Sequence, residues 1–253
     1  MKEPIQFDKI ADIYDFYVNV DFDIPFFLKE TESYHSEILE LMCGTGRVSI
    51  PLLEAGRKLT CVDYSRGMLN SFQKKIKGKN YHVTLVEMDV TKLKLDRKFD
   101  FIFLPFHSIS EILSTEKQRE ALKSISNHLE TNGTFILTLQ NPETRLQQAD
   151  GITKIIGKFP LGNHRKMIIS YMNRYNQTEK IVTGFQFYEI FDSNNILIEK
   201  RCLDINFKPI EINELENMLS DTDLEITNMY GDYSYQDFNN KTSDFIICKM
   251  TKK

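Results

Sequence analysis

The stretch from residue 38 to residue 50 constrains the fold of this chain more than any other. It begins with an apolar run that contains Glu40, turns at Gly44 and Gly46, and then resumes apolar residues at helical spacing. This order predicts a buried strand, a tight loop and a helix. A glycine has no Cβ, so the backbone can turn sharply there and a ligand can approach the main chain. The free N–H groups that open the helix favour a negatively charged ligand group.

Strands and helices alternate after this loop. Short runs of β-branched and aromatic residues predict strands over residues 59–63, 83–88, 99–104 and 134–139, and a long helix is expected over residues 115–129. Such alternation is typical of an α/β fold, with a mostly parallel sheet and helices on both faces. Ligands of such sheets bind at the carboxyl ends of the strands.

Acidic side chains mark several of those strand ends. Glu40 lies near the end of the first predicted strand, Asp63 ends the second and Asp89 follows the third. Residues 106–108 follow the fourth strand and are expected at the same edge. Ser65 has the character of a helix N-cap for the segment that continues into a lysine-rich end.

The rhythm of the chain changes after residue 141. Alternating patterns predict an inserted antiparallel meander with strands over residues 165–172, 181–191 and 196–207. A helix over 209–219 and strands over 224–230 and 243–250 are expected to return the chain to the main sheet. We therefore predict one domain from residues 1–150 and 208–253, with residues 151–207 as an inserted antiparallel sheet.

Composition excludes several classes of protein. The formal net charge is −4 and 27% of the residues are charged, which argues against a surface that binds nucleic acid by neutralising phosphates. No apolar run is long enough to span a membrane and the start of the chain has no secretion signal, so we expect a cytoplasmic protein with no membrane partner. The scattered Cys43, Cys61, Cys202 and Cys248 predict buried, reduced thiols and no metal site.

These residues resemble the class I, Rossmann-like, S-adenosylmethionine (SAM)-dependent methyltransferases. The resemblance covers about residues 36–140, and the terminal strand pair and the inserted meander are similar in layout to the small-molecule branch, which includes amino-sugar N-methyltransferases and glycine N-methyltransferase-like enzymes. It implies a seven-stranded sheet, and the insert would cap the substrate. The matching segments are residues 40–46, Val62-Asp63 with Ser65 and Met68, Met88-Asp89-Val90, Phe99-Asp100, and Leu129 followed after three residues by Gly133.

The resemblance also implies residue roles. The loop from Gly44 to Gly46 would bind the methionyl carboxylate of SAM, with Glu40 near its ammonium group. Asp63 would accept hydrogen bonds from the ribose hydroxyls, and Asp89 from the adenine amino group. Many members carry a further glycine where this chain has Met42. The implied cofactor-binding residues are Tyr14, Glu40, Met42, Gly44, Thr45, Gly46, Asp63, Tyr64, Met68, Asp89, Val90 and Phe106.

Methyl transfer from a sulfonium is an in-line displacement, so alignment and exclusion of water carry most of the catalysis. A base is optional; His107, Glu111 and Tyr14 are the candidate catalytic residues. Candidates for the acceptor side are Tyr171, Arg174, Tyr188, Tyr230, Tyr233 and Tyr235.

We expect N- or O-methylation of a small-molecule acceptor by a monomer or a homodimer. Three alternatives remain open. A dinucleotide site also suits two glycines followed by an acid, although Glu40 favours SAM and Ser49 stands where a third glycine would be. A methyltransferase acting on protein or RNA and a non-catalytic SAM-binding protein are the others.

Overall fold

A computed structural model describes residues 3–253; Met1 and Lys2, which begin the first predicted domain segment, lie outside the described residues. A seven-stranded sheet forms the main body, in the order β10-β11-β5-β4-β1-β2-β3. The five neighbouring strands β3, β2, β1, β4 and β5 run parallel to one another. Strand β11 pairs antiparallel with both β5 and β10. Its strands are β1 (Glu37–Leu41), β2 (Lys58–Asp63), β3 (Val83–Glu87), β4 (Phe99–Leu104), β5 (Leu129–Gln140), β10 (Leu224–Tyr230) and β11 (Phe245–Lys252).

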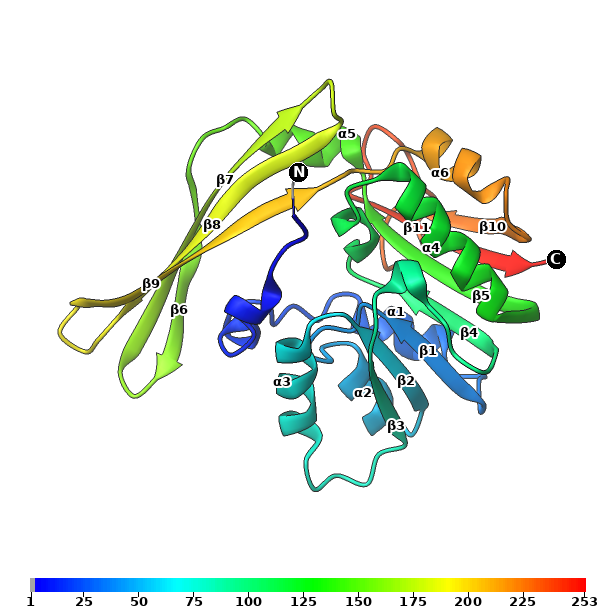
Figure 1. Ribbon diagram of the computed structural model, residues 1–253, viewed down its shortest axis with the longest axis horizontal. Helices are drawn as coiled ribbons and strands as arrows, with labels where there is room; N and C mark the ends of the chain where they lie inside the picture. Colours follow the sequence, from blue (N-terminus) through cyan, green and yellow to red (C-terminus); the bar gives the residue numbers. More distant parts are fainter. Residues whose placement is uncertain (1–2) are drawn as a thin grey trace.

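Helices cover both faces of this sheet (Figure 1). On one face α1 (Ile24–Glu30), α2 (Ser49–Glu54) and α3 (Arg66–Ile76) pack on one hydrophobic core. On the other face α4 (Thr115–His128) and α6 (Ile212–Leu219) pack on a second core. Residues of β4 alternate between the two cores, because successive side chains of a strand point to opposite faces. The predicted α/β class and mostly parallel sheet are confirmed.

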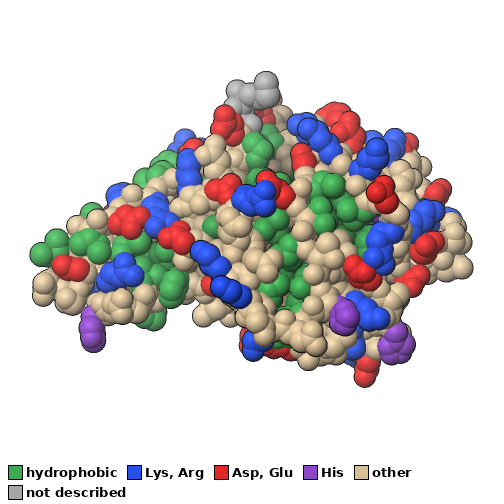
Figure 2. All heavy atoms as spheres, turned by 60° about the horizontal axis from the view of Figure 1, so that its bottom comes forward, with side chains coloured by type: hydrophobic (Ala, Val, Ile, Leu, Met, Phe, Trp, Pro, Cys, Tyr) green, Lys and Arg blue, Asp and Glu red, His purple; other side chains and the backbone are tan. Residues whose placement is uncertain are grey.

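A separate antiparallel sheet lies beside the main body, with the order β6-β7-β8-β9 (Figure 1). Its strands are β6 (Lys154–Gly162), β7 (Arg165–Asn176), β8 (Ile181–Phe191) and β9 (Leu197–Phe207). Two short elements, α5 (Pro142–Arg145) and η5 (Leu146–Gln148), lead into it from β5. Figure 2 shows hydrophobic side chains among acidic and basic ones at the end of the molecule that carries this sheet, and charges of both signs are interspersed over the rest of that face.

The amino-terminal segment packs between the two sheets. It contains two short 3₁₀ helices, η1 (Phe7–Lys9) and η2 (Tyr14–Phe16). Ile5, Ile10 and Ile13 are buried in a third core together with Tyr188 and other residues of the four-stranded sheet. The segment also contacts α3, because Asp8 Oδ1 accepts hydrogen bonds from Ser65 Oγ and the Gly67 N–H. It therefore ties the two sheets together.

Three sequence expectations need correction. The meander has four strands rather than three, because the sequence analysis missed β6. Gly157 and Pro160 interrupt the alternation of apolar and polar residues in this edge strand. Both of its faces are also exposed, as Ile155 and Ile156 show. Strand β5 begins at Leu129, where a helix end was predicted, because Leu129 already pairs with Phe99 of β4.

The third correction concerns the cysteines. All four are free thiols, but Cys202 is exposed on the edge strand β9, whereas Cys43, Cys61 and Cys248 are buried as expected. Two shorter structures, η3 (Val90–Lys92) and η4 (Ser108–Glu111), complete the fold at the carboxyl ends of β3 and β4. None of the helices within residues 3–253 has the length and apolar character needed to cross a membrane.

Candidate active site

The glycine loop after β1 is held by Asp63 at the end of β2. One Asp63 oxygen accepts the Gly44 N–H at 2.8 Å and the other accepts the Ser65 N–H at 2.8 Å. Met42, Gly44 and Gly46 all have positive φ angles, of 55°, 57° and 81°. Met42 thus adopts, at some strain, a left-handed conformation that glycine takes freely. Apart from its two chain neighbours, no residue within 3–253 has an atom within 4 Å of the Cβ position at Gly44, so the loop is open to an approaching ligand there.

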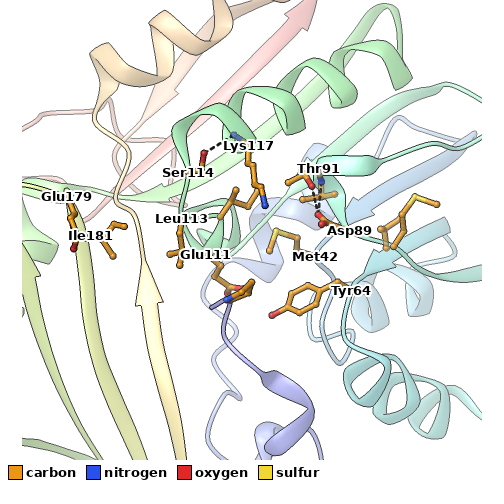
Figure 3. A pocket seen from close by; sticks show the side chains of 15 residues that line it. Met42, Tyr64, Asp89, Thr91, Glu111, Leu113, Ser114, Lys117, Glu179 and Ile181 are labelled. Carbon is orange, nitrogen blue, oxygen red and sulfur yellow. Dashed lines mark hydrogen bonds between the residues drawn. The ribbon is translucent and has the colours of Figure 1, made fainter. Parts of the chain in front are cut away.

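A cavity of about 690 Å³ lies at the carboxyl ends of β1, β2 and β3 (Figure 3). Met42, Tyr64 and Asp89 enter it from the three strand ends, and Ile181 of the four-stranded sheet lines its far side. Asp89 Oδ1 accepts both the N–H and the hydroxyl of Thr91, while its Oδ2 accepts no hydrogen bond within residues 3–253. The remaining lining residues are Pro4, Val62, Met88, Val90, Thr91, Glu111, Ile112, Leu113, Ser114, Lys117 and Glu179.

A second, smaller cavity of about 250 Å³ lies under the four-stranded sheet. The amino-terminal segment contributes Tyr14 and Tyr17, the end of β4 contributes Phe106 and His107, and η4 contributes Glu111. Glu111 lines both cavities, so this side chain borders both spaces. The other lining residues are Ile5, Phe7, Val18, Ser110, Gln140, Arg145, Gln186, Ile205, Phe207 and Pro209.

Two titratable groups that line the smaller cavity have strongly shifted pKa values. Burial, reinforced by the charge of Asp63, raises the pKa of Glu111 to about 8. Burial, with the positive charges of Arg145 and Arg47, lowers the pKa of His107 to about 3. The Nδ1 atom of His107 has no hydrogen-bond partner in the described part of the chain. His107 is therefore a neutral imidazole at pH 7, and Glu111 can exchange a proton near neutral pH.

The chain bends sharply at the end of β4. Phe106 and His107 are consecutive left-handed residues, with φ angles of 56° and 52°, and their rings stack with centroids 4.8 Å apart. Non-glycine residues in this conformation cost roughly 1–3 kcal/mol each and gather at functional sites. The bend turns both rings into the smaller cavity.

Arg47 is a residue of this region that sequence reasoning missed. Its guanidinium forms two hydrogen bonds of 2.6 Å with the fully buried Asp23, and it lies 4.6 Å from the centre of the Phe106 ring. Its position directly after Gly46, in the predicted ligand-binding loop, was the sequence feature that could have identified it as a site residue. The positive charge of Arg47 also influences the pKa values of Glu40, Tyr14 and His107. Arg47 therefore affects the electrostatics of both the glycine loop and the end of β4.

The predicted site residues divide into three groups. Met42, Tyr64, Asp89, Val90 and Glu111 line the larger cavity, whereas Tyr14, Phe106, His107 and again Glu111 line the smaller one. Six others are not among the residues that line either cavity: Glu40, Gly44, Thr45, Gly46, Asp63 and Met68.

The tyrosines expected on the acceptor side line neither of these cavities. Tyr188 is buried beneath the smaller cavity, where its hydroxyl is hydrogen-bonded to Tyr17. Tyr230, Tyr233 and Tyr235 instead pack on the α1 face of the main sheet.

Known proteins share this arrangement. Residues 38–133 match the family described as "Methyltransferase domain". The cypemycin N-terminal methyltransferase of a Streptomyces species is 31% identical over 133 residues, which are 53% of this chain and 53% of that protein. The chain thus spans about half the length of this relative.

Solved structures agree over the whole chain. The CcbJ methyltransferase of Streptomyces caelestis superposes with a TM-score of 0.80 at 20% identity, covering 100% of this chain and 99% of that one. Residues 38–133 thus match a methyltransferase domain, and the chain as a whole has the fold of this methyltransferase. SAM-bound CalS10, an amino pentose methyltransferase of Micromonospora echinaspora, covers all of both chains with a TM-score of 0.70 at 14% identity.

The chemistry of the larger cavity suits an adenosine-containing ligand. The larger cavity has apolar walls from Met42, Val90 and Leu113 and one carboxylate oxygen of Asp89 free to accept a hydrogen bond. An adenosine group needs both features, namely apolar faces for its ring and an acceptor for its amino group. The open backbone at Gly44 follows β1 in the same loop as Met42, which lines the cavity.

Proposed function

We propose that this protein transfers a methyl group from SAM to a nitrogen or oxygen of a small-molecule acceptor by in-line displacement. The observation that carries the proposal is that one side chain, Glu111, lines both cavities. The larger cavity lies at the strand ends where this class of domain binds its donor, and the smaller one lies under the inserted sheet. A donor in one and an acceptor in the other bring their reacting atoms together near Glu111.

The donor site is assigned as follows. Asp89 accepts from the adenine amino group, with Tyr64 and Val90 against the ring, and Met42 forms the floor of the cavity. Asp63 has a second lone pair on each oxygen for the ribose hydroxyls, while it also holds the loop through Gly44 and Ser65.

SAM, when bound, supplies a methyl group on a positively charged sulfur. The protein aligns the acceptor with that methyl group and excludes water, which is worth roughly 7–11 kcal/mol of the barrier. An attacking amine must be neutral, so its proton has to leave before or during transfer. Glu111, when ionised, can take that proton because its pKa of about 8 is near working pH. His107 and Tyr14 remain neutral at pH 7 and shape the acceptor cavity.

The size and shape of the acceptor cavity support a small acceptor. At about 250 Å³ it suits a small molecule or one end of a chain better than a folded protein or RNA surface. The face in Figure 2 also has interspersed charges of both signs, whereas a nucleic-acid surface is strongly positive. The names of the relatives fit this choice: one methylates a peptide terminus and another an amino pentose. The two sheets define the domain boundaries that we propose, with residues 151–207 as the cap over the acceptor.

Filling the larger cavity tests the donor assignment. Leu113→Trp adds bulk to the cavity wall, so we expect the affinity for S-adenosylhomocysteine (SAH) to fall more than tenfold in calorimetric titrations. Leu197→Trp, on an exposed position of β9, is the matched control and should bind as the unmodified protein does. Wild-type protein should also form SAH from SAM with a panel of small amines and alcohols. Undiminished SAH binding by Leu113→Trp would reject the donor assignment.

A further inference from the structure

Arg145 is a cation in the acceptor cavity that no acidic side chain neutralises. It ends α5, directly after β5, and its guanidinium forms no ion pair with any of residues 3–253. Its Nε donates to the Gln140 amide oxygen at 2.7 Å and its Nη1 to the Gln148 amide oxygen at 3.4 Å. The guanidinium carbon lies 5.0 Å from the centre of the Phe207 ring. These contacts orient the group, but amide oxygens and an aromatic ring do not cancel its charge.

The position of Arg145 is costly without an anion. Burial lowers its pKa from the usual value, which shows that the protein environment disfavours the charge. An arginine nevertheless stays protonated at neutral pH. Its Nη2 donates no hydrogen bond to any described residue, so donor capacity remains on the guanidinium.

The charges that line the smaller cavity are few and of opposite sign. Among its lining residues Arg145 is charged at pH 7 and Glu111 becomes charged when it loses its proton near pH 8; the two form no ion pair with each other. Glu111 also lines the larger cavity, whereas Arg145 comes from the β5 side. The other lining residues are uncharged and include the aromatic side chains of Phe106 and Phe207. A ligand complementary to this cavity carries a basic group at one end and an anionic group at the other.

We propose that the methyl acceptor is an amine that also carries a carboxylate or phosphate group, and that Arg145 binds this anionic group while the amine lies at Glu111. This inference rests on the proposed function and names the class of acceptor for the same site. The planar guanidinium suits either anion, because two parallel N–H groups match two oxygens. Arg145 therefore acts as a specificity-determining residue, and Gln140 and Gln148 keep it in place.

The test uses pairs of amines that differ by one anionic group. Phenylalanine is paired with phenethylamine, 4-(aminomethyl)benzoate with benzylamine, and O-phosphoethanolamine with ethanolamine. Binding of each is measured by calorimetry to the chain of residues 1–253, both with and without saturating SAH. Methyl transfer is followed separately as SAH formation from SAM.

We expect at least one anionic member to bind about tenfold or more tightly than its neutral partner, since a charge-assisted hydrogen bond is worth that much. The pair that discriminates tells whether the anion is a carboxylate or a phosphate. Arg145→Gln should reduce the preference to within about twofold without changing the affinity for SAH. Arg145→Lys should keep part of it. Arg165→Gln, which removes an exposed arginine of β7, is the matched control and should keep all of it.

Three results would overturn the inference. One is that no anionic probe is preferred by the wild-type protein, including the case in which no probe binds. Another is a full preference retained by Arg145→Gln. The third is a loss of SAH affinity in Arg145→Gln, which would assign Arg145 to the donor instead. Failure of the wild-type protein to bind SAH or SAM rejects the proposed function by a separate measurement, and the titrations without SAH still decide the role of Arg145.

Discussion

Glu40 is a carboxyl group held away from water at the end of β1. It is 1% exposed and accepts a 2.5 Å hydrogen bond from the Ser49 hydroxyl. Burial raises its pKa to about 8, although the Ser49 hydrogen bond and the charge of Arg47 oppose the shift. The native protein therefore holds a neutral Glu40 at pH 7, whereas the unfolded chain ionises near the ordinary value of 4.5.

This difference predicts a pH-dependent stability. A carboxyl group whose folded pKa is raised contributes stability below pH 4.5 that is lost as pH rises to about 8. The slope reaches about 1.4 kcal/mol per pH unit. The side chain of residue 40 in Glu40→Gln is neutral at every pH, so this variant does not lose that stability. In urea titrations, the free energy of unfolding of the variant minus that of the wild type should increase between pH 5 and pH 8. Glu111 is present in both proteins and cancels from the comparison. Parallel stability curves would contradict the assigned pKa.

Single residues show how far sequence could predict the site. Met42, Tyr64 and Asp89 were found because each follows a predicted strand, and strand ends of a parallel sheet converge. Arg145 in the acceptor cavity was missed because it depends on how α5 leaves β5 and packs against Phe207, 62 positions further along the sequence. Local patterns carry no information on such tertiary contacts.

Among the elements, the amino-terminal segment is fixed to α3 by one carboxylate. Asp8 Oδ1 accepts the Gly67 N–H at 2.5 Å and the Ser65 hydroxyl at 3.0 Å, in the first turn of the helix. Acidic groups at a helix start stabilise by about 0.3–1 kcal/mol. The same segment brings Pro4 into the wall of the larger cavity.

Asp8→Ala should therefore lower the free energy of unfolding by about 0.5–1 kcal/mol and weaken SAH binding a few-fold, because the cavity wall loosens. Urea titration and calorimetry measure the two effects. Asp21→Ala removes another exposed acid of the same segment, one whose carboxylate has no hydrogen bond within residues 3–253, and should leave both unchanged. Equal behaviour of the two variants would show that the Asp8 contact does not hold the segment.

Elements with strong local signals matched their predictions closely. Ser65 caps α3 as expected, by accepting the Met68 N–H at 3.1 Å. Strand β6 was missed because it is stabilised by pairing with β7, and its own residues alternate poorly around Gly157 and Pro160. An edge strand of this kind is specified by its neighbour rather than by its own pattern.

On the scale of the whole molecule, the third hydrophobic core packs the four-stranded sheet against the amino-terminal segment, which in turn contacts the main body. It combines Ile5, Ile10 and Ile13 of the amino-terminal segment with Ile169 and Tyr188 of the four-stranded sheet. The Tyr17 and Tyr188 hydroxyls, 2.9 Å apart, add a polar contact across it. The acceptor cavity lies between the same partners, so its shape depends on this core.

Ile10 is fully buried in this core, and truncation of such a side chain costs about 2–5 kcal/mol. Ile10→Ala should lower the melting temperature and impair methyl transfer to the acceptor more than it impairs SAH binding, because the donor cavity is built mainly from the strand ends of the main sheet. Ile198→Ala, at an exposed position of β9, is the control and should change neither property. Calorimetric unfolding, SAH titration and SAH formation from SAM give the three readouts. An Ile10→Ala protein that loses SAH affinity and turnover in equal proportion would mean that the segment supports the donor site as much as the acceptor cavity.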